Sequence, residues 1–292
     1  MDFRSNNIIF LNGKFLPDDR AMVSIFDRGF MYGDGLFETM RSYDGTIFAL
    51  DLHLERLVGS AKIIGISLRQ NKKYFSNILH NTLKINGLTT GNAYVKLIIT
   101  RGLDCGRIIP SKSLKPTIAI VARPLDVKKI KHYQQKGMGA VFLSNKIRSI
   151  PQVKSLNLLA NITGLIEANQ RRMQEGIFTH GNKILEGAIT NIFISDGKSL
   201  KTPPIKDGIL AGVTRRLVIE LAKKQGIKIV EISLTMEDLK NSAEAFLTNS
   251  IMEIVPLVKI EKKLIDHGLP GIFTRRLQYA YKQMMLSLDF FH

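Results

Sequence analysis

The sequence predicts an α+β fold with a small N-terminal α/β domain and a larger, strand-rich C-terminal domain. Strands gather in hairpins, helices are added around them, and no regular βαβ alternation runs through the 292 residues. A hydrophobic fraction of 45% supplies an ordinary globular core, and the length suits two modest domains. We expect the small domain over 1–122, a linker over 123–136 and the large domain over 137–292.

The N-terminal half begins with two expected hairpins. Apolar and polar residues alternate around Asn12-Gly13 and again up to Asp44-Gly45, and both dipeptides are typical of tight turns. Further on, apolar residues recur at helical spacing up to closing glycines, and two other segments are rich in β-branched residues. These segments predict helices over 52–64 and 72–87 and strands over 93–102 and 116–125.

The C-terminal half follows a charged stretch, 123–136, which we interpret as an interdomain connection with little regular structure. Beyond it, short β-branched segments alternate irregularly with longer helical patterns. The expected strands are 140–145, 191–197, 227–233 and 244–250, and the expected helices are 157–176, 214–226, 235–241 and 273–286.

Composition excludes several classes of protein. No apolar run is long enough for a membrane span, and the apolar patch near the N-terminus is too short for a signal peptide. The single cysteine, Cys105, excludes a disulfide framework and suits a reducing cytoplasm. The six histidines are scattered, so we expect no metal site.

The formal charge of +17 is high for a globular protein. The basic residues are spread along the chain, mostly on the polar faces of expected helices, and no nucleic-acid-binding motif accompanies them. We therefore interpret the charge as a solvated surface that also favours small anionic substrates. Nucleic-acid binding without catalysis is kept as a remote alternative.

Lys154 stands where an extended stretch ending at Val153 meets an expected helix. It is either a surface cation or an amine held in a pocket. A cation is disfavoured at the positive N-terminal end of a helix, which argues mildly for the pocket. The local sequence alone still favours the solvated interpretation.

Other polar residues stand at positions suited to an anionic ligand. Arg56 lies on a helix face opposite the apolar stripe, either at the surface or facing an anion. Val213 and Thr214 open a helix, whose first turn has unpaired amides that suit a phosphate or simply need a cap. Ser250 adds a hydroxyl after a strand, and Glu186 ends another as a turn ligand or a buried acceptor.

In this order and spacing, these motifs resemble the fold-type IV pyridoxal-phosphate enzymes, the class IV aminotransferase family. The resemblance covers essentially the whole chain. It implies the two-domain fold-type IV architecture, an active site between the domains, and a homodimer whose second subunit completes that site. The motifs are "DRGFMYGDGLFETMR" (27–41), "HLERL" (53–57), "KSLNLLAN" (154–161), "EGAITNIF" (186–193), "GVTR" (212–215) and "NSIMEIVP" (249–256).

The resemblance also implies a cofactor, pyridoxal 5′-phosphate, and a role for each motif. Lys154 would form the Schiff base with the cofactor and then act as general base. Glu186 would keep the pyridine nitrogen protonated. Four groups would hold the phosphate: Arg56, Val213, Thr214 and Ser250.

Three activities of the family compete. Branched-chain aminotransferases usually have three residues between the lysine and an Asn-Tyr pair. Here only two residues separate Lys154 from Asn157, and Leu158 stands in place of the tyrosine, which argues against that activity. "KSLNLLAN" is close to the D-amino acid aminotransferases, but their Arg-x-His carboxylate clamp is not evident. Thr39, Lys96 and Arg107 match the 4-amino-4-deoxychorismate lyases, which release pyruvate and 4-aminobenzoate in folate biosynthesis.

The sequence therefore favours the lyase, with a D-amino acid or broad branched-chain aminotransferase as the alternative. The lyase substrate carries carboxylates, so a pocket with Arg41, Lys96 and Arg107 is electrostatically sensible. Thr39 would help deliver a proton to the departing enolpyruvyl group, and Tyr32 and Phe37 would form the pocket wall. Thr39 as a plain strand residue, and Lys96 or Arg107 as surface charge, remain open alternatives.

Overall fold

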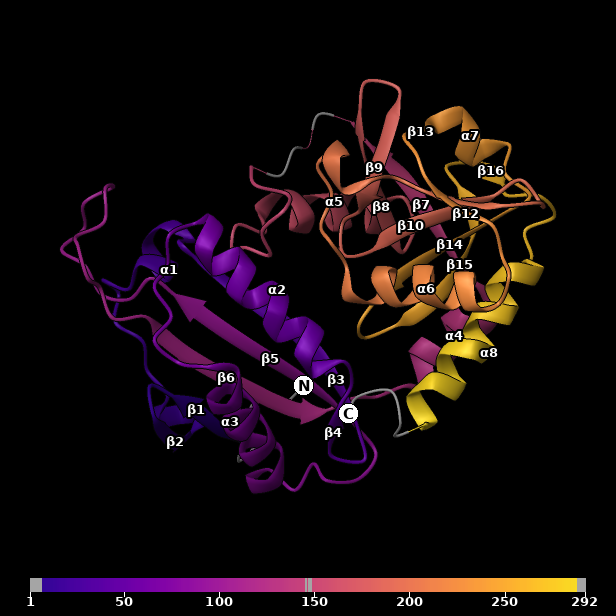
Figure 1. Ribbon diagram of the computed structural model, residues 1–292. Helices are drawn as coiled ribbons and strands as arrows, with labels where there is room; N and C mark the ends of the chain where they lie inside the picture. Colours follow the sequence, from indigo (N-terminus) through magenta and orange to yellow (C-terminus); the bar gives the residue numbers. More distant parts are fainter. Residues whose placement is uncertain (1–6, 145, 147–148, 288–292) are drawn as a thin grey trace. The chain divides into compact units, whose positions relative to one another are not determined.

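A computed structural model describes residues 7–144, 146 and 149–287 of the chain (Figure 1). The chain forms two compact units. The first unit is Met1–Asp126 with Val153–Asn157, and the second is Val127–Gln152 with Leu158–His292. Helices take 33% of the residues and strands 31%, which confirms the α+β class.

The first unit is built on an antiparallel sheet with strand order β2-β1-β6-β5-β3-β4. Residues 12 and 13 have positive φ angles of 49° and 92°, so the expected Asn-Gly hairpin turn is confirmed. The elements of this unit are β1 (Ile8–Leu11), β2 (Lys14–Pro17), α1 (Arg28–Tyr32), β3 (Gly35–Tyr43), β4 (Thr46–Ile47), α2 (Leu50–Ile63), α3 (Lys72–Ile85), β5 (Asn92–Thr100) and β6 (Thr117–Pro124).

Helices α2 and α3 bury their apolar faces against this sheet. Leu57 of α2 and Leu79 of α3 belong to the same buried cluster as Met40 of β3 and Leu97 of β5. Alternation along β3 therefore sends Glu38 and Met40 to the helix side and Phe37 and Thr39 to the opposite face.

The second unit contains a mixed sheet with strand order β12-β11-β10-β14-β15-β7-β8-β9-β13, and β16 pairs with β15. Its elements are α4 (Lys128–Lys136), β7 (Met138–Leu143), α5 (Leu159–Gln170), β8 (Glu175–His180), β9 (Lys183–Gly187), β10 (Asn191–Ser195), β11 (Leu200–Thr202), α6 (Val213–Lys224), β12 (Ile229–Glu231), β13 (Leu234–Thr235), α7 (Met236–Lys240), β14 (Glu244–Asn249), β15 (Glu253–Ile260), β16 (Lys263–Leu264) and α8 (Ile272–Leu286).

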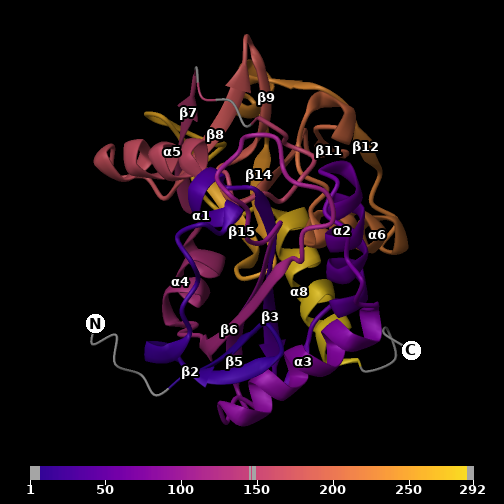
Figure 2. The same cartoon turned by 90° about the vertical axis from the view of Figure 1, so that its left-hand side faces the viewer.

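Apolar side chains are buried on both faces of this sheet, because Ile192 and Leu247 belong to one core cluster while their buried neighbours Phe193 and Phe246 alternate to the opposite face. Helices α6 and α8 lie side by side and pack on β14 and β15 (Figures 1 and 2). The rings of Phe193 and Phe246 stack at 4.9 Å between adjacent strands β10 and β14. None of the helices within the described ranges is long and apolar enough to cross a membrane.

Two local expectations are wrong. The charged stretch 123–136 is not structure-poor, because β6 continues to Pro124 and α4 spans Lys128–Lys136, anchored by the buried side chain of Ile130. The helix expected over 157–176 spans only Leu159–Gln170, and β8 begins at Glu175. Lys154 therefore precedes this helix by five residues, and the dipole argument does not apply to it.

Candidate active site

The amine of Lys154 lies against an aromatic ring of the first unit. The N–H of Phe37 donates to the carbonyl of Lys154 at 2.9 Å, and the N–H of Leu156 donates to the carbonyl of Gly35 at 3.0 Å. This pairing holds Lys154 extended alongside β3, and its Nζ lies 4.6 Å from the centroid of the Phe37 ring. Lys154 is therefore a partly buried amine in contact with an aromatic ring, and its place in a pocket stays a prediction.

A second amine shares that ring. Lys96 Nζ lies 4.7 Å from the centroid of Phe37, and Lys96 is the direct cross-strand partner of Thr39. Desolvation by burial, helped by the charge of Arg123, lowers the pKa of Lys96. The structure thus brings together Lys154, Lys96, Phe37 and Thr39, a group suited to a carboxylate-bearing substrate.

Arg56 lies in a buried ionic cluster. Its Nε and Nη2 donate to the two carboxylate oxygens of Glu38 at 2.8 and 2.6 Å, and His53 Nδ1 lies 2.7 Å from Glu38 Oε2. Burial favours a raised pKa for Glu38, but the charge and hydrogen bonds of Arg56 and the contact with His53 outweigh it and lower the pKa to about 2. Arg56 is thus held by a carboxylate that the sequence analysis did not single out.

The other predicted substrate residues make contacts of their own. Arg41 is buried, and its Nε and Nη2 donate to Asn92 Oδ1 at 3.0 and 2.8 Å. The hydroxyl of Tyr32 donates to the carbonyl of Gly106 at 2.6 Å. Arg107 is exposed, and its carbonyl accepts a hydrogen bond from Arg28. Substrate binding by Arg41, Tyr32 and Arg107 stays a prediction.

In the second unit, Glu186 is a buried acceptor with 4% of its surface exposed. Its Oε2 accepts hydrogen bonds from the N–H of Leu210 at 3.0 Å and from Asn191 Nδ2 at 3.3 Å. Asn191 Nδ2 also lies 3.0 Å from the carbonyl of Leu210. The alternative of a simple turn ligand is thereby excluded, because the Glu186 carboxylate on β9 is hydrogen-bonded to Asn191 on β10 and to Leu210 in the loop before α6.

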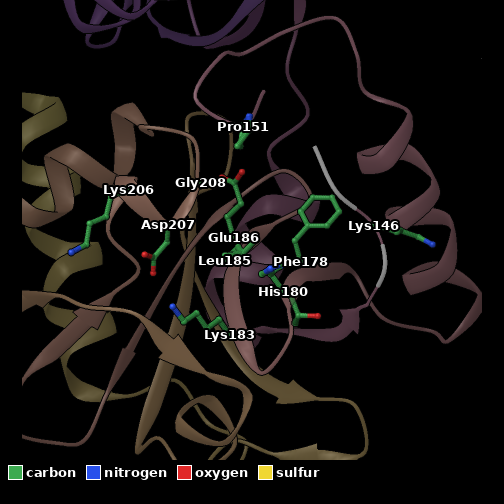
Figure 3. A pocket seen from close by; sticks show the side chains of 11 residues that line it. Lys146, Pro151, Phe178, His180, Lys183, Leu185, Glu186, Lys206, Asp207 and Gly208 are labelled. Atoms are coloured by element: carbon green, nitrogen blue, oxygen red, sulfur yellow. The ribbon is translucent and has the colours of Figure 1, made fainter. Parts of the chain in front are cut away.

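Glu186 also contributes to the lining of a cavity of about 420 Å³. Figure 3 shows Glu186 and Leu185 in the middle of this lining, with Asp207 on one side and Phe178 on the other. The remaining lining residues are Lys146, Pro151, Thr179, His180, Lys183, Lys206 and Gly208.

The first turn of α6 lies two residues beyond the Leu210 contact. Gly212 is the N-cap of this helix and provides no side-chain cap for the amides of Val213 and Thr214. A Cβ on Gly212 would lie 2.0 Å from Asn191 Oδ1, so Asn191 packs directly on this helix start. The second unit thus places Glu186, Asn191 and the start of α6 in one hydrogen-bonded region.

Two hydroxyls lie at or beyond the end of β14. Thr248 pairs with Asn191 across the strands, and among the described residues its buried Oγ1 has no hydrogen-bond partner. Ser250 follows in a turn fixed by Asn249, whose Oδ1 accepts from the amides of Ile251 and Met252. A buried hydroxyl without a protein partner, across the strands from Asn191, suits an anionic ligand.

Glu38 and Asn191 contact predicted site residues but were not themselves predicted from the sequence. Glu38 could have been found as an acid that alternation places on the apolar, helix-covered face of a strand. Asn191 opens a strand only five residues after Glu186, a weaker signal.

Comparison with known proteins identifies the family. The family described as "Amino-transferase class IV" matches residues 35–260. The chain belongs to the class IV aminotransferases. This class IV aminotransferase is 38% identical to a putative branched-chain-amino-acid aminotransferase of Methanocaldococcus jannaschii, over 94% of the chain and 96% of the relative. It is 35% identical to the aminodeoxychorismate lyase of Bacillus subtilis, with 96% of each chain covered.

A third relative and a solved structure complete the comparison. The D-alanine aminotransferase of Staphylococcus haemolyticus is 30% identical over 96% of this chain and 98% of its own. The branched-chain amino acid aminotransferase of Escherichia coli superposes with a TM-score of 0.91 at 27% identity, with 98% of each chain covered. The fold-type IV architecture and the assignment as an enzyme are thereby confirmed.

Class IV aminotransferases use pyridoxal 5′-phosphate, and the residues of this chain fit that cofactor. The buried carboxylate of Glu186 suits a protonated ring nitrogen, and the uncapped start of α6 with the unpaired Thr248 hydroxyl suits a phosphate. Within the described residues, no three His, Cys, Asp or Glu side chains are grouped so as to hold a metal ion.

Proposed function

We propose that this class IV aminotransferase transfers the amino group of an amino acid to a 2-oxo acid. The observation that carries the proposal is the pair of amines on Phe37, because Lys154 supplies a base and Lys96 a cation for the substrate carboxylate. Relatives named as aminotransferases include one at 38% identity, which favours transamination over the lyase reaction that the sequence analysis preferred.

Each predicted residue has a role in this proposal. Lys154 would hold the cofactor covalently, and the carboxylate of Glu186 would face its ring nitrogen. Five groups hold the phosphate: Arg56, the amides of Val213 and Thr214, the Thr214 hydroxyl and Ser250. The unpaired hydroxyl of Thr248 is an additional candidate for this set.

The chemistry of these residues is proton movement in a partly desolvated site. Bound pyridoxal phosphate supplies an electron sink for the pair left on the substrate α-carbon. Lys154 Nζ would remove the proton from that carbon, and Lys96, whose amine contacts the same Phe37 ring, would bind the substrate carboxylate. Glu186 keeps the proton on the ring nitrogen, because its buried carboxylate interacts best with a positive group.

A second candidate function is the 4-amino-4-deoxychorismate lyase reaction. Thr39 stands directly opposite Lys96 on the sheet face that carries Phe37, so a hydroxyl lies beside the proposed carboxylate site. A hydroxyl there could deliver a proton to a departing enolpyruvyl group. The B. subtilis relative at 35% identity is named for this activity.

The visible spectrum of the purified, cofactor-loaded enzyme separates the two functions. We expect D-alanine or L-leucine, added without a 2-oxo acid, to bleach the yellow absorbance, and a 2-oxo acid to restore it. The Lys154→Ala variant is the control and should show no bleaching on the same timescale. Unchanged absorbance with both amino acids, together with pyruvate release from aminodeoxychorismate, would reject transamination and establish the lyase.

We also propose that the enzyme works as a homodimer. Several large apolar side chains of the first unit are exposed in the single chain, including Met22 at 78%, Ile25 at 66% and Phe30 at 75%. Residues 22–31 therefore form a surface whose burial against a second copy would be favourable.

A further inference from the structure

Glu175, the first residue of β8, is a buried carboxylate that the proposed chemistry does not use. None of its surface is exposed. Its oxygens accept hydrogen bonds from the amides of Gly176 at 2.9 Å and Ala188 at 3.1 Å and from the hydroxyl of Thr190 at 2.9 Å, with the amide of Ile189 at 3.4 Å. All four donors are neutral, so this carboxylate is held by dipoles and not by a cation.

Three of these donors, Ala188, Ile189 and Thr190, belong to the turn between β9 and β10, so this turn is hydrogen-bonded to the side chain of Glu175. The turn is closed by the N–H of Gly187, which donates to the carbonyl of Thr190 at 2.8 Å. It is also tightly packed, because a Cβ on Gly187 would lie 2.0 Å from Thr190 Oγ1 and 3.0 Å from Glu175 Oε2. The carboxylate of Glu175 therefore sets the shape of residues 187–190.

The two ends of this turn carry the residues of the candidate site. Glu186 immediately precedes it and Asn191 immediately follows it, and their side chains meet at 3.3 Å. Both also bind the backbone of Leu210, at its N–H and its carbonyl. A change in the turn would thus alter the Glu186–Asn191 contact and the link to the loop before α6.

We propose that Glu175 is a positioning residue that fixes Glu186 and Asn191 through the 187–190 turn. The proposal rests on the proposed function, in which Glu186 is the partner of the cofactor's ring nitrogen. Burial raises the pKa of Glu175 to about 7, while the donors from Gly176, Thr190, Ile189 and Ala188 oppose this shift. Burying an ionisable carboxyl group costs free energy of folding, which is consistent with a role for Glu175 beyond filling space.

The variant Glu175→Gln tests this proposal, because it keeps the shape of the side chain but turns an N–H₂ group toward two of the four donors. A matched control exists in the same unit. Glu244 is also buried and accepts from the amides of Phe273 and Thr274 and from the Thr274 hydroxyl. It lies opposite Ser195, at the other end of β10 from Asn191. Glu244→Gln thus removes a similar acceptor without touching the turn.

Two measurements are made on both variants. The first is amide hydrogen exchange of the cofactor-free protein, where we expect Glu175→Gln to deprotect residues 187–191 and the amide of Leu210 selectively. The second is steady-state kinetics, where kcat should fall about 10- to 100-fold with little change in KM, as expected for a misplaced catalytic group. Glu244→Gln should instead deprotect the start of α8 and leave kcat near the wild-type value.

The outcomes separate this proposal from the proposed function. Unchanged exchange at Leu210 in Glu175→Gln, or the same exchange pattern in both variants, would overturn the positioning role. Selective exchange at Leu210 with unchanged kcat would support positioning and instead reject Glu186 as a catalytic group. If Glu175→Gln does not fold, Thr190→Val removes one donor of the same turn, and a smaller change in the same direction is expected in both measurements.

Discussion

At the scale of single residues, the cluster of Glu38, His53 and Arg56 explains how the arginine side chain is kept in one orientation inside the first unit. Two parallel hydrogen bonds fix the plane of the Arg56 guanidinium, and the carboxylate compensates its charge. Burial, opposed by the contact with Glu38, lowers the pKa of His53, so the imidazole is neutral near pH 7. The cluster therefore carries one cation and one anion, and its order depends on Glu38 staying ionised.

Glu38→Gln should accordingly lower stability in a pH-dependent way. The pKa of Glu38 falls from 4.5 in the unfolded chain to about 2 in the fold, so ionisation stabilises the native state by roughly 3 kcal/mol above pH 4.5. This contribution is lost as the pH falls from about 4.5 toward 2. Urea unfolding of both proteins at several pH values should show a deficit of roughly that size at pH 7, shrinking below pH 4.5.

Glu55→Gln is the control for this measurement. Glu55 lies on α2 next to Arg56 but is exposed, so its contribution should stay below about 1 kcal/mol. A Glu38→Gln deficit that did not change with pH would contradict the ion-pair explanation and point to packing alone.

At the scale of elements, the start of α6 depends on a glycine. Gly212 has an ordinary φ of −66°, so a side chain there meets no backbone strain, yet its Cβ would lie 2.0 Å from Asn191 Oδ1. We expect Gly212→Ala to displace Asn191, to lower the free energy of unfolding by about 1–3 kcal/mol and to weaken binding of pyridoxal phosphate. Calorimetry and cofactor titration measure both effects.

A second glycine provides the contrast. Gly59 lies within α2 and has open space around its Cβ position. Gly59→Ala should leave cofactor binding unchanged and raise stability by about 0.5–1 kcal/mol through helix propensity. Equal cofactor affinity in Gly212→Ala and the wild type would show that the Asn191 contact does not shape this end of the site.

The elements also show what a sequence can predict. Helices α2 and α3 and the Asn12-Gly13 hairpin match their predictions because apolar spacing and turn residues are local signals, whereas the five-residue helix α1 was not predicted. Helix α4 was missed because its nine residues, KKIKHYQQK, bury a single apolar side chain fully, so tertiary contact and not periodicity stabilises it.

The candidate site rests on sequence signals of two kinds, local motifs and contacts between distant segments. Lys154 and Glu186 stand in motifs whose order along the chain is itself informative, and the structure gives each a distinctive environment. The partners Glu38 and Asn191 were not predicted, because their contacts join segments 18 and 19 residues away along the chain. Such contacts depend on strand register and loop path, which a single sequence leaves open.

At the scale of the whole molecule, the path of the chain gives Lys154, the proposed catalytic lysine, an unusual position. The chain leaves the second unit after Gln152, contributes Val153–Asn157 to the first unit and returns at Leu158. Within the first unit, backbone hydrogen bonds to Phe37 and Gly35 hold this short segment against β3. The order of Lys154 therefore depends on the sheet of the first unit, although the chain before Val153 and after Asn157 belongs to the second.

The exposed apolar surface of residues 22–31 predicts the assembly of the enzyme. In sedimentation at micromolar concentration, we expect a mass twice the 32.8 kDa of one chain. Phe30→Asp should shift the protein toward monomers, because it would place a charge in an apolar interface. Leu269→Asp, at a side chain of the second unit that is 72% exposed, is the control and should leave the mass unchanged. A wild-type mass of one chain, or a Phe30→Asp dimer as stable as the wild type, would remove this surface from the interface.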